Sequence, residues 1–229
     1  MRVALTFDTE GGFDFPEHTV GAAGWGRVLE VLHREGVPAT FFLQADWLAA
    51  EPGLGRRTAG GGHLLGNHTL NHVALGRFPN RLDEQVGVAD AVARAVLPGV
   101  DLRPWFRLPY FSGDRDPAVL AALAARGWEH VGASADSRDW DPSTAAGGPD
   151  RVLANVLADV DQGRRDCAVV LMHTWPAATG RALPDLIAEL RRRGADFCRV
   201  DELTRRERAA LPARDGGRDP VSGSGAGAG

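Results

Sequence analysis

The 229-residue sequence contains no lysine, and all 26 of its basic residues are arginine. Heavy use of alanine and glycine and a single tyrosine accompany this absence. GC-rich coding DNA produces this combination without any selection on the protein. The missing lysine therefore carries no functional weight.

Cysteine and long apolar runs are also scarce. The two cysteines, Cys167 and Cys198, are too few for a disulfide framework and lie in no CxxC or Cys/His metal pattern, so we expect two buried thiols. No run approaches the roughly 18 apolar residues of a membrane-spanning helix, and no charged leader with an apolar run opens the chain. We predict no membrane segment and a cytoplasmic location, or an extracellular one if the N-terminus is truncated.

The chain has no excess of positive charge either. The net charge is −4: residues 1–204 hold 21 arginines against 27 acids, whereas residues 205–229 hold 5 against 3. A mildly acidic body does not suit a phosphate backbone, which requires a basic face. We therefore predict no nucleic-acid partner.

Apolar runs of strand length alternate with amphipathic helical stretches, as in parallel βαβ units. The predicted strands cover residues 3–7, 39–43, 63–66, 105–107, 129–132, 168–172 and 196–200. The predicted helices lie near residues 22–35, 44–59, 81–97, 116–126, 149–161 and 181–193. This α/β pattern fits a doubly wound sheet or a (β/α) barrel smaller than the eightfold one, and periodicity does not choose between them.

We assign residues 1–204 to one folded domain. Residues 205–229 are rich in Gly, Ala, Ser and Arg. They offer too little apolar area to offset the entropy of ordering, which predicts a disordered tail.

Polar residues follow the first and third predicted strands. The first strand ends in LTFDTEGG, and Asp8 and Glu10 share one face there because strand residues i and i+2 do. The third strand runs into GNHTLNH, where His68 and His72 have the i, i+4 spacing that puts two imidazoles on one helical face, within reach of one zinc ion. Each pattern alone is more often structural than functional.

Three more strands release polar residues at the same end. RLPYFSGD contains Arg107 and Tyr110, ADSRDWDP contains Asp139 and Trp140, and AVVLMHTWP contains His173 after its apolar run. Catalytic residues of barrels and doubly wound sheets lie at the carboxyl ends of the strands. Five strands converging in this way predict an active site.

These five segments resemble, in order, the motifs of the NodB-homology polysaccharide deacetylases, carbohydrate esterase family 4. TFDTE resembles TFDDG, GNHTLNH resembles H(S/T)xxH, RLPYFSGD resembles RxPY, DSRDW resembles DxxDW, and LMH resembles LxH. The resemblance extends from residue 2 to about residue 203. It implies a distorted seven-stranded (β/α) barrel and the metal-dependent hydrolysis of N-acetyl groups on amino sugars.

The resemblance also implies roles for individual residues. His68 and His72 would bind a divalent metal ion, zinc first and cobalt or nickel otherwise. Asp8 would be the catalytic base, held in place by Arg107. The backbone N–H of Tyr110 would help to bind the oxyanion.

The remaining implied roles concern the acid and the acetyl pocket. His173 would be the general acid, oriented by Asp139. Trp140 and Leu171 would line the pocket around the acetyl group of an N-acetylated carbohydrate substrate.

The first motif departs from the family pattern at the third metal ligand. Thr9 stands where the family has a second aspartate, and Glu10 replaces the following glycine. A hydroxyl is a much poorer zinc ligand than a carboxylate. Either Glu10 is the ligand and Asp8 the base, which we favour, or Asp8 binds the metal and Glu10 or water performs the base step.

Two other functions are compatible with the same residues. The chain could be an amidohydrolase of this superfamily that acts on a small non-sugar amide or imide, without metal. It could also be a non-catalytic carbohydrate-binding barrel that lost its chemistry at Thr9. The second is the less favoured, since the base, the acid and both histidines are retained.

Overall fold

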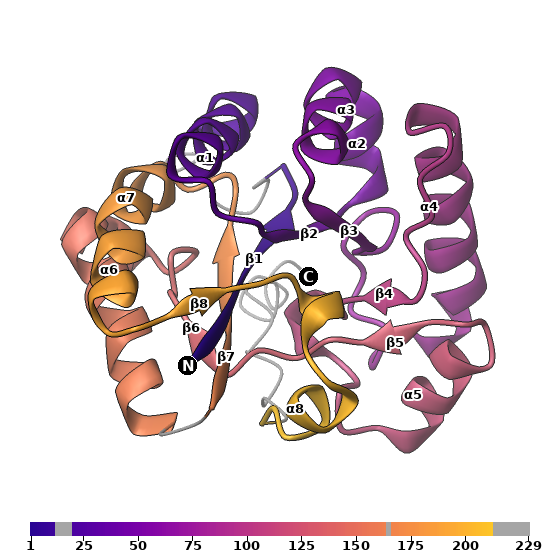
Figure 1. Ribbon diagram of the computed structural model, residues 1–229. Coiled ribbons are helices and arrows are strands. Elements are labelled where there is room, and N and C mark those ends of the chain that lie inside the picture. Colours follow the sequence, from indigo (N-terminus) through magenta and orange to yellow (C-terminus); the bar gives the residue numbers. More distant parts are fainter. Residues whose placement is uncertain (12–19, 164–165, 213–229) are drawn as a thin grey trace, which may run out of the picture.

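The computed structural model describes residues 1–11, 20–163 and 166–212, and its centre is a parallel sheet (Figure 1). The strand order is β5-β4-β3-β2-β1-β7-β6, and β8 also pairs with β1. The strands are β1 (Arg2–Thr9), β2 (Thr40–Leu43), β3 (Leu64–Asn67), β4 (Trp105–Phe106), β5 (Glu129–His130), β6 (Ala135–Asp136), β7 (Cys167–His173) and β8 (Asp196–Phe197). The predicted α/β barrel of the deacetylase type is confirmed, and all seven predicted strands are present.

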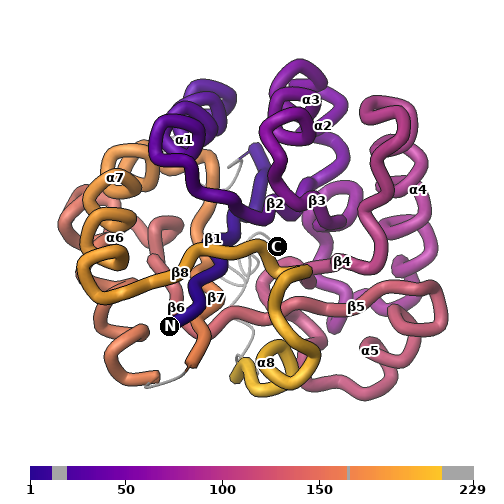
Figure 2. Tube along the Cα trace, viewed as in Figure 1, coloured from indigo at the N-terminus to yellow at the C-terminus, as the bar shows by residue number. Residues whose placement is uncertain are grey.

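Helices surround this sheet on the outside, as the tube in Figure 2 shows. They are α1 (Gly21–Glu35), α2 (Ala45–Ala50), α3 (Pro52–Gly60), α4 (Leu82–Val96), α5 (Pro117–Ala124), α6 (Pro142–Gly163), α7 (Ala177–Arg192) and α8 (Arg205–Ala209). Short 3-10 turns are η2 (Pro79–Arg81), η3 (Pro109–Phe111) and η4 (Val200–Glu202). Within the described ranges, none of the helices has both the length and the apolar character of a membrane span.

The central strand β1 is buried on both faces, which explains its continuous apolar run. Its residues Val3, Leu5 and Phe7 pack in the cluster between the sheet and the helices. The alternate residues point into the barrel: Ala4 joins the interior cluster, and the side chains of Thr6 and Asp8 both bind Arg107. The pleat of β1 therefore delivers Asp8 to the interior at the carboxyl end of the strand.

Helix α1 has the one-sided apolar pattern and the glycine end that predicted a helix in this segment. Trp25, Val28 and Leu32 lie on one buried stripe that packs on the sheet. The helix ends at Gly36, whose φ of 61° is the left-handed conformation that glycine adopts most readily.

The strands β5 and β6 stand at the two ends of the strand order. A short chain segment, here called the seam, joins them in place of a ladder of hydrogen bonds between two strands. Residues 131–134 connect them directly. Val131 donates a backbone hydrogen bond to Phe106, and Ser134 donates one to Val169. The side chain of Arg107 reaches this seam from inside the barrel.

The predicted boundary of the tail at residue 205 is wrong, because the folded body continues to residue 212. Thr204 caps α8 in a capping box with Glu207. Arg208 pairs with Glu129 at 2.8 Å and lies over the Trp105 ring, 4.9 Å from its centroid. Figure 1 shows α8 between α5 and α6, beside the seam. Arginine stems can cover apolar surface in this way, which composition does not reveal. Residues 213–229 lie outside the described residues.

Two helices and one strand also differ from the sequence prediction. The single helix expected over residues 44–59 is divided at Glu51 into α2 and α3. Helix α6 begins before the predicted residue 149 and is interrupted at Gly148, which has a φ of 66°. The two-residue strand β6 was not predicted, since it is too short to carry a periodic signal.

Two glycines of α1 give opposite predictions for the same substitution. A Cβ at Gly24 would overlap the carbonyl oxygen of Thr174, so Gly24→Ala should lower the free energy of unfolding by about 1–3 kcal/mol. At Gly26 the nearest atom to a new Cβ is 3.9 Å away, so Gly26→Ala should raise it by about 0.5–1 kcal/mol. Urea unfolding of both variants tests this packing, and changes of the same sign would contradict it.

Candidate active site

The carboxyl ends of β1, β3 and β7 lie at the same end of the parallel sheet, with β2 between β1 and β3, and they carry most of the candidate site. Asp8 is in register with His173 across β1 and β7. On the other side, β1 pairs with β2, and β2 pairs with β3 up to Asn67, the residue before His68. Parallel pairing therefore brings together segments that are far apart in the sequence.

Arg107 binds Asp8 inside the barrel. The Arg107 guanidinium is fully buried and donates to Asp8 Oδ1 at 2.8 Å and to Thr6 Oγ1 at 2.8 Å. It also donates to the carbonyls of Val131 and Gly132 at 3.1 and 3.3 Å. A buried guanidinium needs both a countercharge and acceptors for its other N–H groups, and these partners supply both.

His68 is held so that one ring nitrogen faces the carboxylates. Its Nδ1 lies 2.9 Å from the backbone oxygen of Arg107, so the neutral tautomer with the proton on Nδ1 donates to that oxygen. Its Nε2 is buried, has no hydrogen-bond partner among the described residues, and lies 3.6 Å from Asp8 Oδ2 and 4.0 Å from Glu10 Oε2. Burial lowers the pKa of His68 although Asp8 opposes the shift, which favours the neutral imidazole that metals bind.

His72 approaches the same point from a turn, and the helix expected for this histidine pair is not present. Thr69 and His72 have positive φ angles of 69° and 63°. The turn is held by Thr69 N–H donating to Asn67 Oδ1 and by His72 N–H donating to Thr69 Oγ1. These local bonds compete with helix formation, yet the imidazoles still meet, with centroids 4.9 Å apart.

Glu10, and not Thr9, points at the two histidines. Glu10 Oε2 lies 2.7 Å from His72 Nε2. The Thr9 hydroxyl instead donates to the Phe7 carbonyl at 3.3 Å. Burial opposes the charged form of Glu10, but His72 and His173 hold the pKa of its carboxyl well below the ordinary value. Glu10, His68 and His72 form a group whose ligand atoms all lie within 4.8 Å of one another.

His173 forms a second cluster with Asp139. Its Nδ1 lies 2.7 Å from Asp139 Oδ1, and its backbone N–H donates to Oδ2 at 2.8 Å. Thr179, in the first turn of α7, donates its hydroxyl to Oδ2 at 2.5 Å. Burial opposes the charged imidazolium, but Asp139 outweighs it and raises the pKa of His173 to about 10. At neutral pH the ring is therefore protonated.

The three residues predicted around the substrate lie in different settings. Tyr110 has a φ of 55°, and its ring packs against His72 with centroids 4.4 Å apart. Leu171 is buried on the inner side of β7. Trp140, the neighbour of Asp139, is 37% exposed and is the one predicted site residue at the surface. A left-handed non-glycine residue such as Tyr110 is strained, and strain of this kind concentrates at functional sites.

Sequence reasoning missed two buried residues that bind the charged groups. Trp175 donates its indole N–H to Glu10 Oε1 at 3.1 Å, and Thr179 binds Asp139. Trp175 lies two residues after His173, and this proximity is the one signal that could have found it. Nothing in the sequence indicates a role for Thr179, because its contact with Asp139 arises from the position of α7 in the folded protein.

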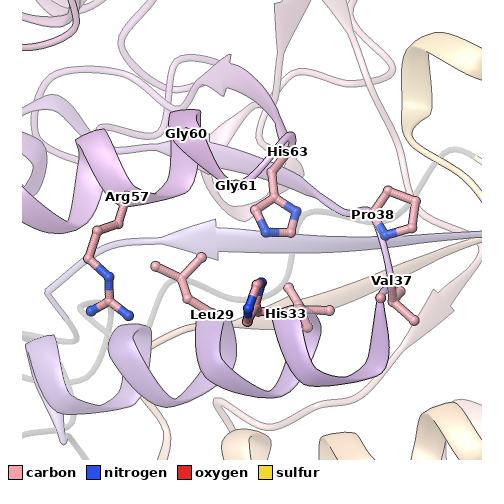
Figure 3. Close-up of a pocket in the computed structure, with 10 residues that line it drawn as sticks. Leu29, His33, Val37, Pro38, Arg57, Gly60, Gly61 and His63 are labelled. Atoms are coloured by element: carbon pink, nitrogen blue, oxygen red, sulfur yellow. The ribbon is translucent and has the colours of Figure 1, made fainter.

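A separate pocket lies at the opposite end of the strands (Figure 3). It has a volume of about 570 Å³ and lies between the C-terminal ends of α1 and α3, with His33, Arg57 and His63 in its wall. Its residues precede β2 and β3, whereas the carboxylates and histidines follow the strands. It contains none of the predicted site residues.

Comparison with known proteins gives a consistent family. The family model described as polysaccharide deacetylase matches residues 1–131. A chitooligosaccharide deacetylase from Bradyrhizobium sp. (strain ANU 289) is 36% identical over 191 residues, 77% of this chain and 82% of the relative. The peptidoglycan-N-acetylglucosamine deacetylase PgdA of Listeria monocytogenes is 30% identical over 203 residues, 88% of this chain but 38% of the relative.

Solved structures support the same assignment. The family 4 carbohydrate esterase from Streptomyces lividans, in complex with acetate, aligns with a TM-score of 0.68 at 25% identity and covers 86% of this chain and 91% of that one. A CE4 family pseudoenzyme from Bacillus anthracis aligns with a TM-score of 0.70 at 23% identity over 88% of this chain and 64% of that one. The latter likeness concerns the fold alone.

Because the Arg107 side chain donates to several acceptors at once, we predict that another positively charged side chain cannot replace it. Lysine keeps the charge but has one nitrogen, which cannot serve Asp8, Thr6 and the seam carbonyls together. Arg107→Lys should therefore lower the free energy of unfolding by about 3 kcal/mol, measured by urea denaturation. Arg191→Lys, at an exposed pair with Glu35, is the matched control and should change it little. Equal effects of the two variants would contradict the role given to Arg107.

Proposed function

Since the chain belongs to the polysaccharide deacetylase family, we propose that it removes the acetyl group from the nitrogen of an N-acetylated amino sugar, using a divalent metal ion held by Glu10, His68 and His72. The observation that carries the metal site is this group of three ligand atoms. The names of the relatives support the substrate class, a chitooligosaccharide or peptidoglycan sugar.

The donor atoms fit a zinc-class ion. Two imidazole nitrogens and one carboxylate oxygen are a common catalytic zinc set, and cobalt and nickel accept the same donors. The buried His68 Nε2, which has no partner among the described residues, would gain one from the ion. A bound ion supplies a Lewis acid that polarises the acetyl carbonyl and lowers the pKa of a water molecule.

Asp8 is proposed as the base that activates this water. Arg107 binds Oδ1, which leaves Oδ2 on the side of His68, at 3.6 Å from its Nε2. From there Oδ2 accepts a proton as the water oxygen bonds to the carbonyl carbon. The alternative, in which Asp8 is the third ligand, is less well supported, since Glu10 Oε2 already lies 2.7 Å from His72.

His173 is proposed as the acid that completes the cleavage. With Nδ1 bound to Asp139, the protonated ring presents Nε2–H on the opposite side, 3.9 Å from Glu10 Oε1. This proton passes to the sugar nitrogen as the C–N bond breaks, so that acetate and the free amine leave. The Tyr110 backbone N–H is the proposed donor to the oxyanion of the tetrahedral intermediate.

The activity is tested by acetate release from N-acetylated chitooligosaccharides. We expect release that stops after chelation and returns on addition of zinc, cobalt or nickel. Activity unchanged by chelation would contradict the metal site. Hydrolysis of a small cyclic imide but no sugar would favour the non-sugar amidohydrolase, and sugar binding without turnover would favour the non-catalytic barrel.

Two isosteric substitutions separate the base from the ligand. Asp8→Asn should retain zinc but lower kcat by about 10²–10⁴, because the proton acceptor is lost. Glu10→Gln should weaken zinc binding itself, which is measured by competition with a chromogenic chelator. If Asp8→Asn lost zinc and Glu10→Gln retained it, the two roles would be reversed.

A further inference from the structure

The indole of Trp175 binds the proposed metal ligand directly. Its Nε1–H donates to Glu10 Oε1 at 3.1 Å, and Trp175 is only 2% exposed. A buried indole N–H requires an acceptor, and a hydrogen bond to an ionised carboxylate is stronger than one between neutral groups. This bond therefore restrains the Glu10 side chain.

The two oxygens of Glu10 face different neighbours. Oε1 accepts from Trp175 and lies 3.9 Å from His173 Nε2. Oε2 lies 2.7 Å from His72 Nε2 and 4.0 Å from His68 Nε2. With Oε1 bound to the indole, Oε2 is the oxygen turned toward the two histidines.

A glutamate in this position needs such a restraint more than an aspartate does. Its extra methylene adds a rotatable bond, and ordering a long flexible side chain costs conformational entropy. A donor that holds Oε1 before metal arrives reduces the entropy lost on binding.

Trp175 is well placed to act as a fixed donor. The backbone N–H of Val20 donates to its carbonyl at 2.9 Å, and the N–H of Thr174 donates to the Asp8 carbonyl at 3.2 Å. The close approach of Gly24 to the Thr174 carbonyl packs the same segment against α1. The indole also lies against the His173 ring, with centroids 5.8 Å apart.

We propose that Trp175 is a positioning residue: its indole N–H orients Glu10 so that Oε2 completes the metal site with His68 and His72. This inference rests on the proposed function, in which Glu10 is a metal ligand. It assigns to Trp175 a role in metal affinity rather than in contact with the substrate.

The test compares two tryptophan-to-phenylalanine variants. Trp175→Phe keeps an aromatic ring but removes the donor, and it should weaken zinc binding about 10–100-fold, measured by chelator competition. It should also shift the visible bands of the cobalt-loaded protein. Trp25→Phe is the matched control: Trp25 is fully buried and its indole donates to Thr58 Oγ1 at 3.1 Å, away from the site. It should leave both readouts unchanged.

A double-variant cycle with Glu10→Ala identifies the route of the effect. If Trp175 acts through Glu10, Trp175→Phe should add no further loss of zinc affinity in the Glu10→Ala protein. An equal loss in both backgrounds would mean that Trp175 acts through packing, which overturns the inference.

The cycle also distinguishes failure of the inference from failure of the proposed function. Unchanged zinc affinity in Trp175→Phe, together with weakened affinity in Glu10→Ala, overturns the inference and leaves the metal site standing. Unchanged affinity in Glu10→Ala, or no zinc binding by the wild type, overturns the metal site and the inference with it.

Discussion

The buried ion pair between Arg107 and Asp8 is the interaction on which the rest of the site depends. A guanidinium inside a barrel is costly to desolvate unless a countercharge and hydrogen-bond acceptors surround it. The countercharge of Arg107 is Asp8 on β1, and its acceptors include the carbonyls of Val131 and Gly132 in the seam. The guanidinium carbon also lies over the Phe42 ring, 4.2 Å from the ring centroid. The backbone carbonyl of Arg107 accepts from His68. Arg107 thus links the segment that joins β5 and β6 to the positions of the Asp8 carboxylate and the His68 ring.

The same pair explains how two carboxylates on one face of β1 acquire separate tasks. Asp8 is compensated from inside the barrel by Arg107, whereas Glu10, two residues further on, faces three histidines and Trp175. Asp139 forms a third acidic centre, which is tied to His173. The shortest ion-pair contact is therefore different for each acid: Arg107 for Asp8, His72 for Glu10 and His173 for Asp139. These separate contacts agree with the proposed division into a base, a metal ligand and the partner of a charged acid.

The α/β class and the meeting of Asp8 with His173 could be predicted from the sequence, because β1 and β7 are long, apolar and end in polar residues. His173 at the end of β7 and Asp8 at the end of β1 follow from that rule. The barrel itself was predicted from the resemblance to the deacetylase motifs, since periodicity alone fits a doubly wound sheet equally well. The turn at His72, in contrast, was predicted as a helical face, since side-chain bonds from Asn67 and Thr69 override spacing. The bond between Trp175 and Glu10 could not be predicted for another reason: it joins residues 165 positions apart, which the β1–β7 pairing brings together.

In the proposed site Glu10 replaces, as the third metal ligand, the aspartate that the family has at the position of Thr9. The most direct test is a crystal structure of the zinc-loaded protein with anomalous diffraction measured at the zinc edge. We expect one anomalous peak about 2.0–2.2 Å from His68 Nε2, His72 Nε2 and a Glu10 carboxylate oxygen, with Asp8 still bound to Arg107. A peak ligated by Asp8 in place of Glu10, or no peak between the two histidines, would contradict it.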